Sequence, residues 1–358
     1  MLLLDDLKHI KKIDKSGMLF NIEDAPNQIS SAINSVSSQL FGVDKDLEFF
    51  DGVVISGMGG SAIAGDIIFD LFASESDKKI YINRGYDIPG FLDKKNLFIA
   101  ISYSGNTQET LASLKVAEER GMRIICVSSG GKLKELAEKK KYLFLSLPED
   151  FVPRAAFYFI FVFLVRLFEF LGCIPMQKEN LNSSIDILIK LKESIGHDVL
   201  EKDNIAKRQA KMIKGKLPLI CTSSMYTAAC GLRLKGQFNE NGKKLAIYSV
   251  LPEMNHNEIG SIFAILPEKN KFVAILLRRG DELFPVKKRL DAVERLWKDK
   301  FGNSSILQID SLGKSKIEKS LSLIFYIDIL SVYSAVLEGV DPTPIEVISA
   351  FKKDMQNE

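Results

Sequence analysis

Two segments in the first third of the chain share one plan: a short apolar run ends in small residues and gives way at once to a helical pattern. The first runs through residues 53–56 into the sequence GMGGSA at 57–62, and the second runs through residues 97–101 into SYSGNT at 102–107. In a sheet of parallel strands, such turns gather backbone N–H groups, hydroxyls and helix N-termini at the carboxyl ends of the strands. The pair therefore predicts an α/β fold with a phosphate-binding cradle at one edge of its sheet.

Either turn alone is open to other interpretations. GMGGSA fits the loose dinucleotide fingerprint G-x-G-x-x-A, and SYSGNT by itself is typical of an ordinary turn with a helix N-cap. A dinucleotide site also needs an acidic residue at the end of the next strand to bind the ribose, but residues 80–82 lead into Asn83 and Arg84. Because an arginine suits a 2′-phosphate, a nicotinamide-dependent enzyme stays an alternative.

The composition and charge exclude several classes of protein. With 358 residues, of which 46% are hydrophobic and 26% charged, the chain is long enough for two domains with large cores. Its net charge of +2 is nearly balanced, and the basic run at 139–141 is short enough to be a solvated helix end. We therefore expect neither a nucleic acid nor a membrane as a partner.

Cysteine usage and apolar stretches indicate the compartment. The chain has four cysteines without metal-ligand spacing, namely Cys126, Cys173, Cys221 and Cys230, and the first and third lie in apolar strand patterns as small core residues. This usage predicts a reducing, cytoplasmic compartment. The start of the chain lacks the charged residues and long apolar core of a signal peptide. The longest apolar stretch, eleven residues at 155–165, is too short to span a bilayer and predicts a buried helix.

Apolar runs and helical patterns alternate after a first stretch of about 50 residues that reads as polar helices. Strands are predicted at 53–56, 80–83, 97–102, 123–128 and 142–147, and again at 219–222, 245–250, 273–277 and 305–309. The alternation predicts two α/β domains, each a mainly parallel sheet flanked by helices on both faces. We expect the first domain, with the phosphate cradle, at residues 1–153 and the second, with linking helices and a C-terminal helix, at 154–358. A cleft between them is the natural substrate site.

Four further segments carry a resemblance to a known family. They are VPRAA at 152–156, KGQFNEN at 235–241, LPEMNHNE at 251–258, and the ending that starts with DPTP at 341–344. GMGGSA and SYSGNT are similar to the two phosphate-binding signatures of the sugar isomerase (SIS) domain. The chain as a whole resembles the bifunctional phosphoglucose/phosphomannose isomerases, which have two such domains. The resemblance implies interconversion of glucose 6-phosphate and mannose 6-phosphate with fructose 6-phosphate, in a homodimer and without a cofactor.

The resemblance places the phosphate of the hexose 6-phosphate in the cradle. The matching positions are glycines and hydroxyl residues: Gly59, Gly60, Ser61, Ser102, Ser104 and Thr107. The implied reaction requires no metal. With three histidines and no cluster of cysteines and histidines, the chain does not resemble the zinc-dependent mannose-phosphate isomerases or the cupin-type glucose-phosphate isomerases.

An aldose phosphate and a ketose phosphate interconvert when one base removes a proton from a carbon and returns it to the neighbouring carbon through an enediol. Glu240 is the expected base, because Asn239 and Asn241 on either side can orient a partly desolvated carboxylate. Without the resemblance, a solvated glutamate at a helix C-terminus near Gly242 is the alternative interpretation.

The resemblance also assigns roles to residues outside this motif. His256, between two asparagines, would open the sugar ring, and in this family the equivalent histidine comes from the neighbouring subunit. Arg154 would stabilise the enediolate oxygens, and Lys352 would assist ring opening, with a register one residue later at Lys353 left open. Thr343 is expected to help admit the substrate at C2 and C3. For His256, Arg154 and Lys352, an ordinary role as a structural or solvent-exposed residue is the alternative.

Two other functions stay open. A non-catalytic sugar-phosphate sensor built from SIS domains predicts an attached DNA-binding domain, and the first 50 or so residues are neither basic nor long enough for one. An amidotransferase-type isomerase that makes glucosamine 6-phosphate needs a glutaminase domain with an N-terminal cysteine, whereas this chain begins Met1-Leu2-Leu3.

Overall fold

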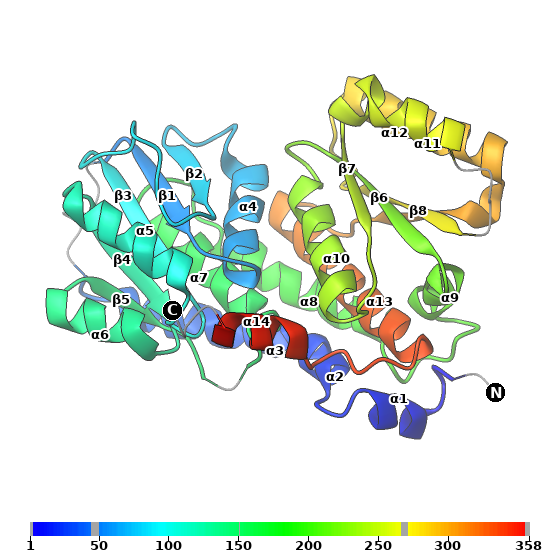
Figure 1. Ribbon diagram of the computed structural model, residues 1–358, viewed down its shortest axis with the longest axis horizontal. Helices are drawn as coiled ribbons and strands as arrows, with labels where there is room; N and C mark the ends of the chain where they lie inside the picture. The colour runs from blue at the N-terminus through cyan, green and yellow to red at the C-terminus, as the bar shows by residue number, and fades with distance from the viewer. Residues whose placement is uncertain (1–2, 44–49, 150, 266–270, 355–358) are drawn as a thin grey trace.

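Two parallel β-sheets stand side by side in the computed structural model, and each lies between layers of helices (Figure 1). The structure describes residues 3–43, 50–149, 151–265 and 271–354. Within these ranges, five strands form the first sheet in the order β2-β1-β3-β4-β5, and four form the second in the order β7-β6-β8-β9. The predicted fold class, two α/β domains with parallel sheets flanked by helices, is confirmed.

The first sheet is buried on both faces. Its strands are β1 (Gly52–Ser56), β2 (Lys79–Asn83), β3 (Asn96–Ile101), β4 (Arg123–Ser128) and β5 (Leu143–Ser146), and its helices are α4 (Gly60–Phe72), α5 (Gln108–Glu119) and α6 (Gly131–Lys140). Successive side chains of a strand point to opposite faces. Val53 and Ile55 therefore pack in the cluster that includes α4, while Val54 packs with α5 and α6. Burial on both faces explains why these strands read as unbroken apolar runs.

The second sheet follows the same plan with different helices. Its strands are β6 (Leu217–Ser223), β7 (Ile247–Leu251), β8 (Phe272–Arg278) and β9 (Ile306–Asp310), and the neighbouring helices are α10 (Ala228–Glu240), α11 (Glu258–Ile265) and α12 (Phe284–Phe301). Ile220 and Ile275 pack in the cluster that includes α10, and Cys221 and Leu276 pack with α12. The predicted strands of both sheets are confirmed, with ends that differ by at most two residues.

A long apolar helix runs through the core of the second domain. This helix, α13 (Lys316–Leu337), packs against α8 (Lys178–Ile195), α9 (Ile205–Ile213) and α10, and Ser315 and Glu318 form a capping box at its start. Within the described ranges, α13 is the one helix long and apolar enough to cross a membrane, and its whole apolar window is buried inside the protein. The apolar sequence of α13 therefore belongs to the core.

The buried helix predicted at 155–165 is also confirmed. It is α7 (Phe157–Phe170), which packs against α3 (Ala25–Leu40) and α4 with eleven buried residues. The predicted domain division after residue 153 falls in the turn before α7 and stays a prediction.

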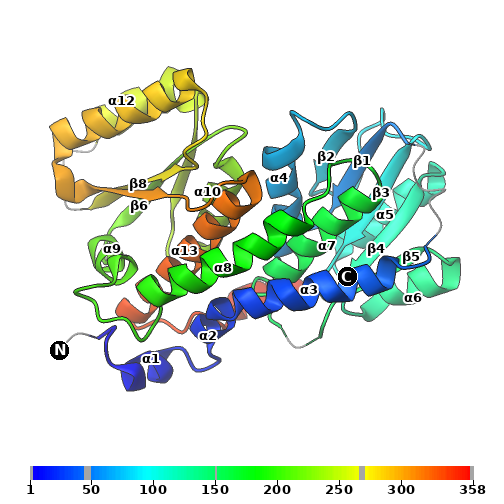
Figure 2. The same cartoon turned by 180° about the vertical axis from the view of Figure 1, so that it is seen from behind.

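The N-terminal region forms α1 (Leu7–Ile13), α2 (Met18–Glu23) and α3. The prediction of polar helices is wrong for α3, because Ile29, Ala32 and Val36 are fully buried. Apolar residues three or four positions apart give a helix one buried face. Helices α3 and α8 run side by side along the back of the molecule (Figure 2). The region is therefore part of the core that both sheets share.

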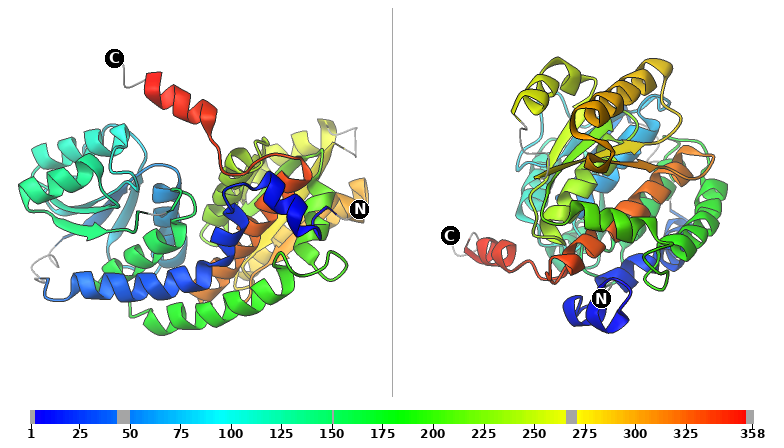
Figure 3. Two further views of the ribbon diagram at one scale, coloured as in Figure 1. Left: turned by 90° about the horizontal axis from the view of Figure 1, so that it is seen from below. Right: turned by 90° about the vertical axis from the view of Figure 1, so that its right-hand side faces the viewer.

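The C-terminal helix α14 (Glu346–Asp354) projects from the body of the molecule (Figure 3). Val347, Ile348 and Phe351 on this helix are exposed. Helix α14 therefore has an apolar side that is not covered within one chain.

The four cysteines are free and buried, and burial raises the pKa of each thiol to about 12. The prediction that Cys126 and Cys221 are core residues is confirmed. The basic run at 139–141 lies at the end of α6 and is exposed to solvent, as the sequence predicts.

Candidate active site

The turn after β1 presents a helix N-terminus. Gly59 is the N-cap of α4 with a φ of 51° and a ψ of −123°, and in the described part of the chain no side chain caps the helix. This positive φ favours glycine, and the start of α4 is the positive end of its dipole, where an anion is stabilised. A Cβ on Gly60 would lie 3.2 Å from the carbonyl oxygen of Pro153. The turn therefore packs directly on the segment that carries Arg154.

The turn after β3 presents hydroxyls. Ser102 and Thr107 hydrogen-bond each other, with 2.8 Å between Oγ and Oγ1, and Ser104 between them is exposed. Gly105 has a φ of 69°, and a Cβ there would lie 1.8 Å from the carbonyl oxygen of Gly130. Only glycine fits this position without movement of the backbone, so the shape of the turn depends on it.

Both turns end neighbouring strands. Residues Ser56 of β1 and Ala100 of β3 are register partners, and the strand order reverses between these two strands. This switch point is where open α/β sheets bind ligands. The structure therefore brings the two predicted halves of the phosphate cradle to one edge of the first sheet.

The six cradle residues differ in their access to solvent. Gly59 and Gly60 line a cavity of about 280 Å³, together with Arg154 and Glu240. Ser104 and Thr107 line a second cavity of about 250 Å³. Ser61 and Ser102 are buried and line neither of these cavities. Gly59, Gly60, Ser104 and Thr107 are therefore the cradle residues that border a cavity.

Glu240 is the last residue of α10 and lines the first cavity. Its Oε2 lies 3.6 Å from Nη1 of Arg154, and 31% of its side chain is exposed. The alternative interpretation was right that the residue ends a helix. Its carboxylate, however, is paired with an arginine in a cavity and is only partly solvated.

Arg154 is buried, with 6% of its side chain exposed. Its Nε donates to Oδ1 of Asn241 at 2.7 Å, and its Nη2 donates to the carbonyl oxygen of Thr343 at 2.8 Å and to that of Pro342. Burial lowers the pKa of the guanidinium, and the Glu240 carboxylate opposes that effect. The interpretation of Arg154 as a solvent-pointing residue is therefore wrong.

A buried polar network contacts Arg154, and the sequence analysis did not predict it. Asp328 of α13 accepts hydrogen bonds from Arg233 at 2.6 and 2.9 Å and from Gln237 at 2.8 Å. Arg233 Nη2 in turn donates to the carbonyl oxygen of Arg154 at 3.3 Å. The signal was present in the sequence, since Asp328 is the one charged residue between 320 and 337. An acid in such an apolar run is buried with a partner more often than alone.

His256 lies apart from these cavities within one chain. It ends the 3-10 helix η2 (Glu253–His256), which follows the cis peptide bond between Leu251 and Pro252, and its side chain is exposed. His256 does not line the cavity that holds Glu240.

The C-terminal segment contacts the site twice. The carbonyl oxygens of Pro342 and Thr343 bind Arg154, and the Thr343 hydroxyl oxygen is buried without a hydrogen-bond partner among the described residues. Farther along, Lys352 of α14 lines the cavity that holds Ser104 and Thr107. The structure therefore brings Lys352 to the cradle, while the side chain of Lys353 lies outside the described residues.

The residues that the dinucleotide alternative invoked have other contacts. Asn83 Nδ2 donates to Ser56 Oγ at 3.3 Å and to the Gly85 carbonyl oxygen at 3.1 Å, and Arg84 pairs with Asp66 of α4. Within the described part of the chain, no three His, Cys, Asp or Glu side chains gather as metal ligands.

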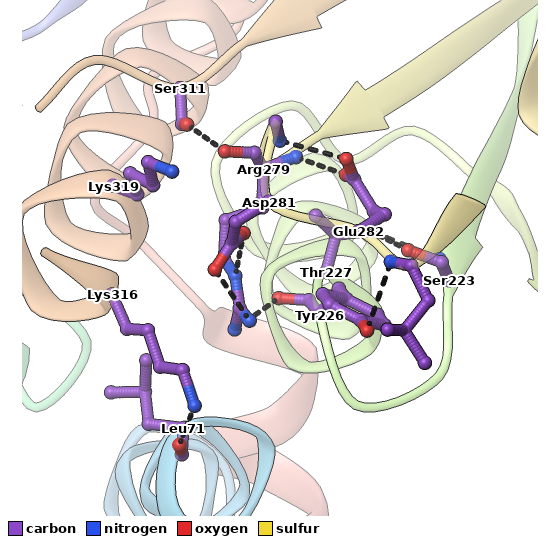
Figure 4. Close-up of polar contacts among 12 residues, drawn as sticks. Leu71, Ser223, Tyr226, Thr227, Arg279, Asp281, Glu282, Ser311, Lys316 and Lys319 are labelled. Atoms are coloured by element: carbon purple, nitrogen blue, oxygen red, sulfur yellow. Dashed lines mark hydrogen bonds and ion pairs between the residues drawn. The ribbon is translucent and has the colours of Figure 1, made fainter. Parts of the chain in front are cut away.

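The corresponding edge of the second sheet is built from charged side chains. After β8, the Glu282 carboxylate accepts from the backbone N–H of Arg279 at 2.6 Å and of Gly280 at 2.9 Å. Asp281 binds the Arg279 guanidinium at 2.7 and 3.2 Å, as Figure 4 shows. At the start of α10, Asp70 of α4 accepts from the N–H of Ala229 at 2.8 Å. The donors at this edge are therefore already bound to carboxylates of the chain itself.

Comparisons with known proteins agree with this architecture. Two family models match the chain: the SIS domain at residues 51–162, and the bacterial phospho-glucose isomerase C-terminal SIS domain at residues 202–355. A solved structure of a hypothetical protein from Thermus thermophilus matches with a TM-score of 0.73 at 14% identity, covering 98% of this chain and 94% of that one. At this identity, the likeness supports the fold alone.

Two curated relatives are similar in sequence. A bifunctional phosphoglucose/phosphomannose isomerase from Caldicellulosiruptor bescii is 34% identical over 338 residues, which cover 94% of this chain and 98% of the relative. A D-glucosamine-6-phosphate 4-epimerase from Sulfolobus acidocaldarius is 37% identical over 222 residues, 62% of this chain and 66% of the relative. The first relative aligns along nearly its whole length, so the resemblance found in the motifs is confirmed. The chain belongs to the family of bifunctional phosphoglucose/phosphomannose isomerases and is an aldose–ketose isomerase.

Proposed function

We propose that this protein interconverts fructose 6-phosphate with glucose 6-phosphate and mannose 6-phosphate through a cis-enediol. The observation that carries the proposal is the position of the Glu240 carboxylate, 3.6 Å from the buried Arg154 guanidinium, in the cavity that Gly59 and Gly60 also line. A base and a fixed cation beside an anion-binding turn are the groups that this reaction needs.

Glu240 acts as the base that moves a proton between C1 and C2. In the direction from fructose 6-phosphate, the carboxylate takes a proton from C1, and the C–H electron pair forms the C1–C2 double bond while the C2 carbonyl becomes an enediolate oxygen. The proton of the C1 hydroxyl moves to this oxygen, and the same carboxyl group then returns its proton to C2 as the C1 carbonyl forms. The oxidation of one carbon balances the reduction of its neighbour, so the reaction needs neither an external oxidant nor a cofactor. Metal independence is part of this proposal, because the guanidinium of Arg154 supplies a permanent positive charge next to the enediolate oxygens.

The phosphate binds at the cradle, where Gly59, Gly60 and Ser61 lead into α4 and where Ser102, Ser104 and Thr107 form the second turn. Binding at this end holds C1 and C2 near Glu240, because the same cavity contains the turn and the carboxylate. Glucose 6-phosphate and mannose 6-phosphate differ only at C2. Removal of the C2 proton from either sugar gives the same enediol, which accounts for a bifunctional enzyme.

Ring opening is assigned to His256 and Lys352. His256 is exposed and lies away from Glu240 of its own chain, so we propose that the partner subunit of a homodimer supplies it. Lys352 reaches the cradle from α14. The proposal includes a cytoplasmic location, which the free state of the four cysteines supports.

Conversion of fructose 6-phosphate by the purified protein, after chelator treatment, tests this function. We expect glucose 6-phosphate and mannose 6-phosphate, measured separately by NMR. Glu240→Gln should lower kcat about 10²–10⁴-fold while fructose 6-phosphate still binds. Glu135→Gln, which changes an exposed glutamate of α6, is the matched control and should leave kcat unchanged.

Other outcomes would select other functions. Binding of fructose 6-phosphate without turnover by the wild-type protein would favour the sugar-phosphate sensor. Conversion of glucosamine 6-phosphate at C4, with no change in fructose 6-phosphate, would favour the reaction named for the Sulfolobus acidocaldarius relative.

A further inference from the structure

Arg84 lies beside the phosphate cradle without a role in the function proposed above. It directly follows β2, and the register pairs Asn83 of β2 with Ser56 of β1. The carboxyl ends of adjacent parallel strands meet at one edge of the sheet, so Arg84 lies next to the turn that contains Gly59. Arg84 lines the same cavity as Gly59 and Gly60.

The arginines that line this cavity differ in their exposure to solvent and in how many protein oxygens they bind. Arg154 and Arg233 are buried, with 6% and 4% of their side chains exposed, and each binds several protein oxygens. Arg84 is 38% exposed and pairs with Asp66 through Nη2. A guanidinium has five N–H donors in a planar fork, so a pair at one end leaves the other side able to bind a phosphate.

Asp66 explains why a cation is needed at this point. It lies in the second turn of α4, close to the start of the helix that receives the phosphate, and burial raises its pKa while Arg84 lowers it. An unpaired carboxylate there would repel a phosphate dianion. Arg84 therefore offsets a negative charge that lies next to the cavity.

The same loop also borders the second half of the cradle. Two residues after Arg84, Tyr86 lines the cavity that contains Ser104, Thr107 and Lys352. The segment 84–86 thus borders both cavities.

We infer that Arg84 is a further phosphate-binding residue, which binds the phosphate of the substrate while it remains paired with Asp66. Segment 84–86 forms the outer wall of the cradle. This inference rests on the proposed function, since it names a residue of the same site, but the binding of inorganic phosphate tests it without turnover.

The test is a double-mutant cycle on Arg84 and Asp66, with calorimetric measurement of inorganic phosphate and fructose 6-phosphate binding. Arg84→Gln should weaken the binding of both about tenfold, and raise KM more than it lowers kcat. Asp66→Asn should leave phosphate binding unchanged or tighter. The double variant should bind more tightly than Arg84→Gln, because the repulsion by Asp66 is gone, but more weakly than Asp66→Asn, because the contact from Arg84 is still missing. Arg84→Lys should lie between Arg84→Gln and the wild type, because it keeps the charge without the fork.

Lys202→Gln, at an exposed pair with Asp203, is the matched control for loss of one positive charge and should bind phosphate as the wild type does. The thermal unfolding midpoint of each variant establishes that it is folded. Wild-type binding by Arg84→Gln would overturn the inference. Equal binding by the double variant and Asp66→Asn would also overturn it, because Arg84 would then only neutralise Asp66. An inactive wild-type protein that still binds phosphate through Arg84 would refute the proposed function alone.

Discussion

The two sheets end in edges of the same kind, but the hydrogen-bond donors at these edges have different partners. At the first edge, two turns of glycines and hydroxyls surround the uncapped start of α4. At the second edge, Glu282 and Asp70 occupy the backbone N–H groups, and Asp281 occupies the Arg279 guanidinium. A doubly wound sheet always gathers donors at its switch point. On the proposed function, these donors bind a ligand at the edge where the chain does not supply carboxylates of its own.

The largest expected effect comes from the glycines in the two corresponding turns. Gly105→Ala places a Cβ 1.8 Å from the Gly130 carbonyl oxygen, whereas the nearest atoms to a Cβ on Gly280 lie beyond 4 Å. Both residues have positive φ, so both substitutions strain the backbone. We expect Gly105→Ala to lower the free energy of unfolding by roughly 3–5 kcal/mol and Gly280→Ala by about 1 kcal/mol, measured by urea denaturation. Equal losses would mean that the first turn relaxes around the new methyl group and is no more constrained than the second.

A pH effect is expected from the carboxylate that caps α10. Burial raises the pKa of Asp70 to about 6, against an ordinary value of 3.8, although the Ala229 N–H and Arg279 oppose the rise. The folded state therefore binds this proton more tightly than the unfolded state does. The carboxylate thus makes folding less favourable as pH rises from about 4 to about 6, and the deficit persists above pH 6.

Asp70→Asn removes this titration. The free energy of unfolding of the variant, relative to the wild type, should rise by about 2–3 kcal/mol between pH 4 and pH 7. Asp299→Asn, at an exposed position of α12, is the control and should show no such change. A difference that does not vary with pH would mean that the second edge does not bury a charge.

The smallest effect separates the hydroxyls of the two edges. Ser104 and Ser224 are both exposed and follow the ends of β3 and β6. Ser104→Ala should weaken the binding of inorganic phosphate by about 1 kcal/mol, or roughly fivefold, and Ser224→Ala should leave it unchanged, both measured by calorimetry. If both substitutions weakened binding equally, phosphate would bind at the edges of both sheets, and the proposed difference between the two edges would be wrong.

The sequence predicted the fold closely because its signals are local. Strands buried on both faces read as continuous apolar runs, and glycines and hydroxyl residues indicate the turns that follow β1 and β3. The buried face of α3 was overlooked, although its apolar residues recur at helical spacing.

Local sequence patterns did not predict the contacts that Arg154 and Glu240 make. Arg154 binds Asn241 and Thr343, which lie 87 and 189 residues away along the chain. Contacts at this separation depend on how distant segments of the chain pack together, and no local pattern encodes them. The same holds for Asp70, which resembles any helical aspartate until the start of α10 packs against it.

The contact between Asp70 and Ala229 also joins the two helices that form the proposed site. The start of α4 and the end of α10 meet at the cavity, and the end of α4 meets the start of α10 at Asp70, so the two helices run antiparallel. Each has 13 residues, or about 20 Å of rigid length. On the proposed function, one helix holds the phosphate and the other holds the base. The packing of these two helices then fixes the distance between phosphate and base, and with it the number of carbon atoms that fit between phosphate and carbonyl. The hydrogen bond between Asp70 and Ala229 helps to hold this distance, although neither residue lines the cavity.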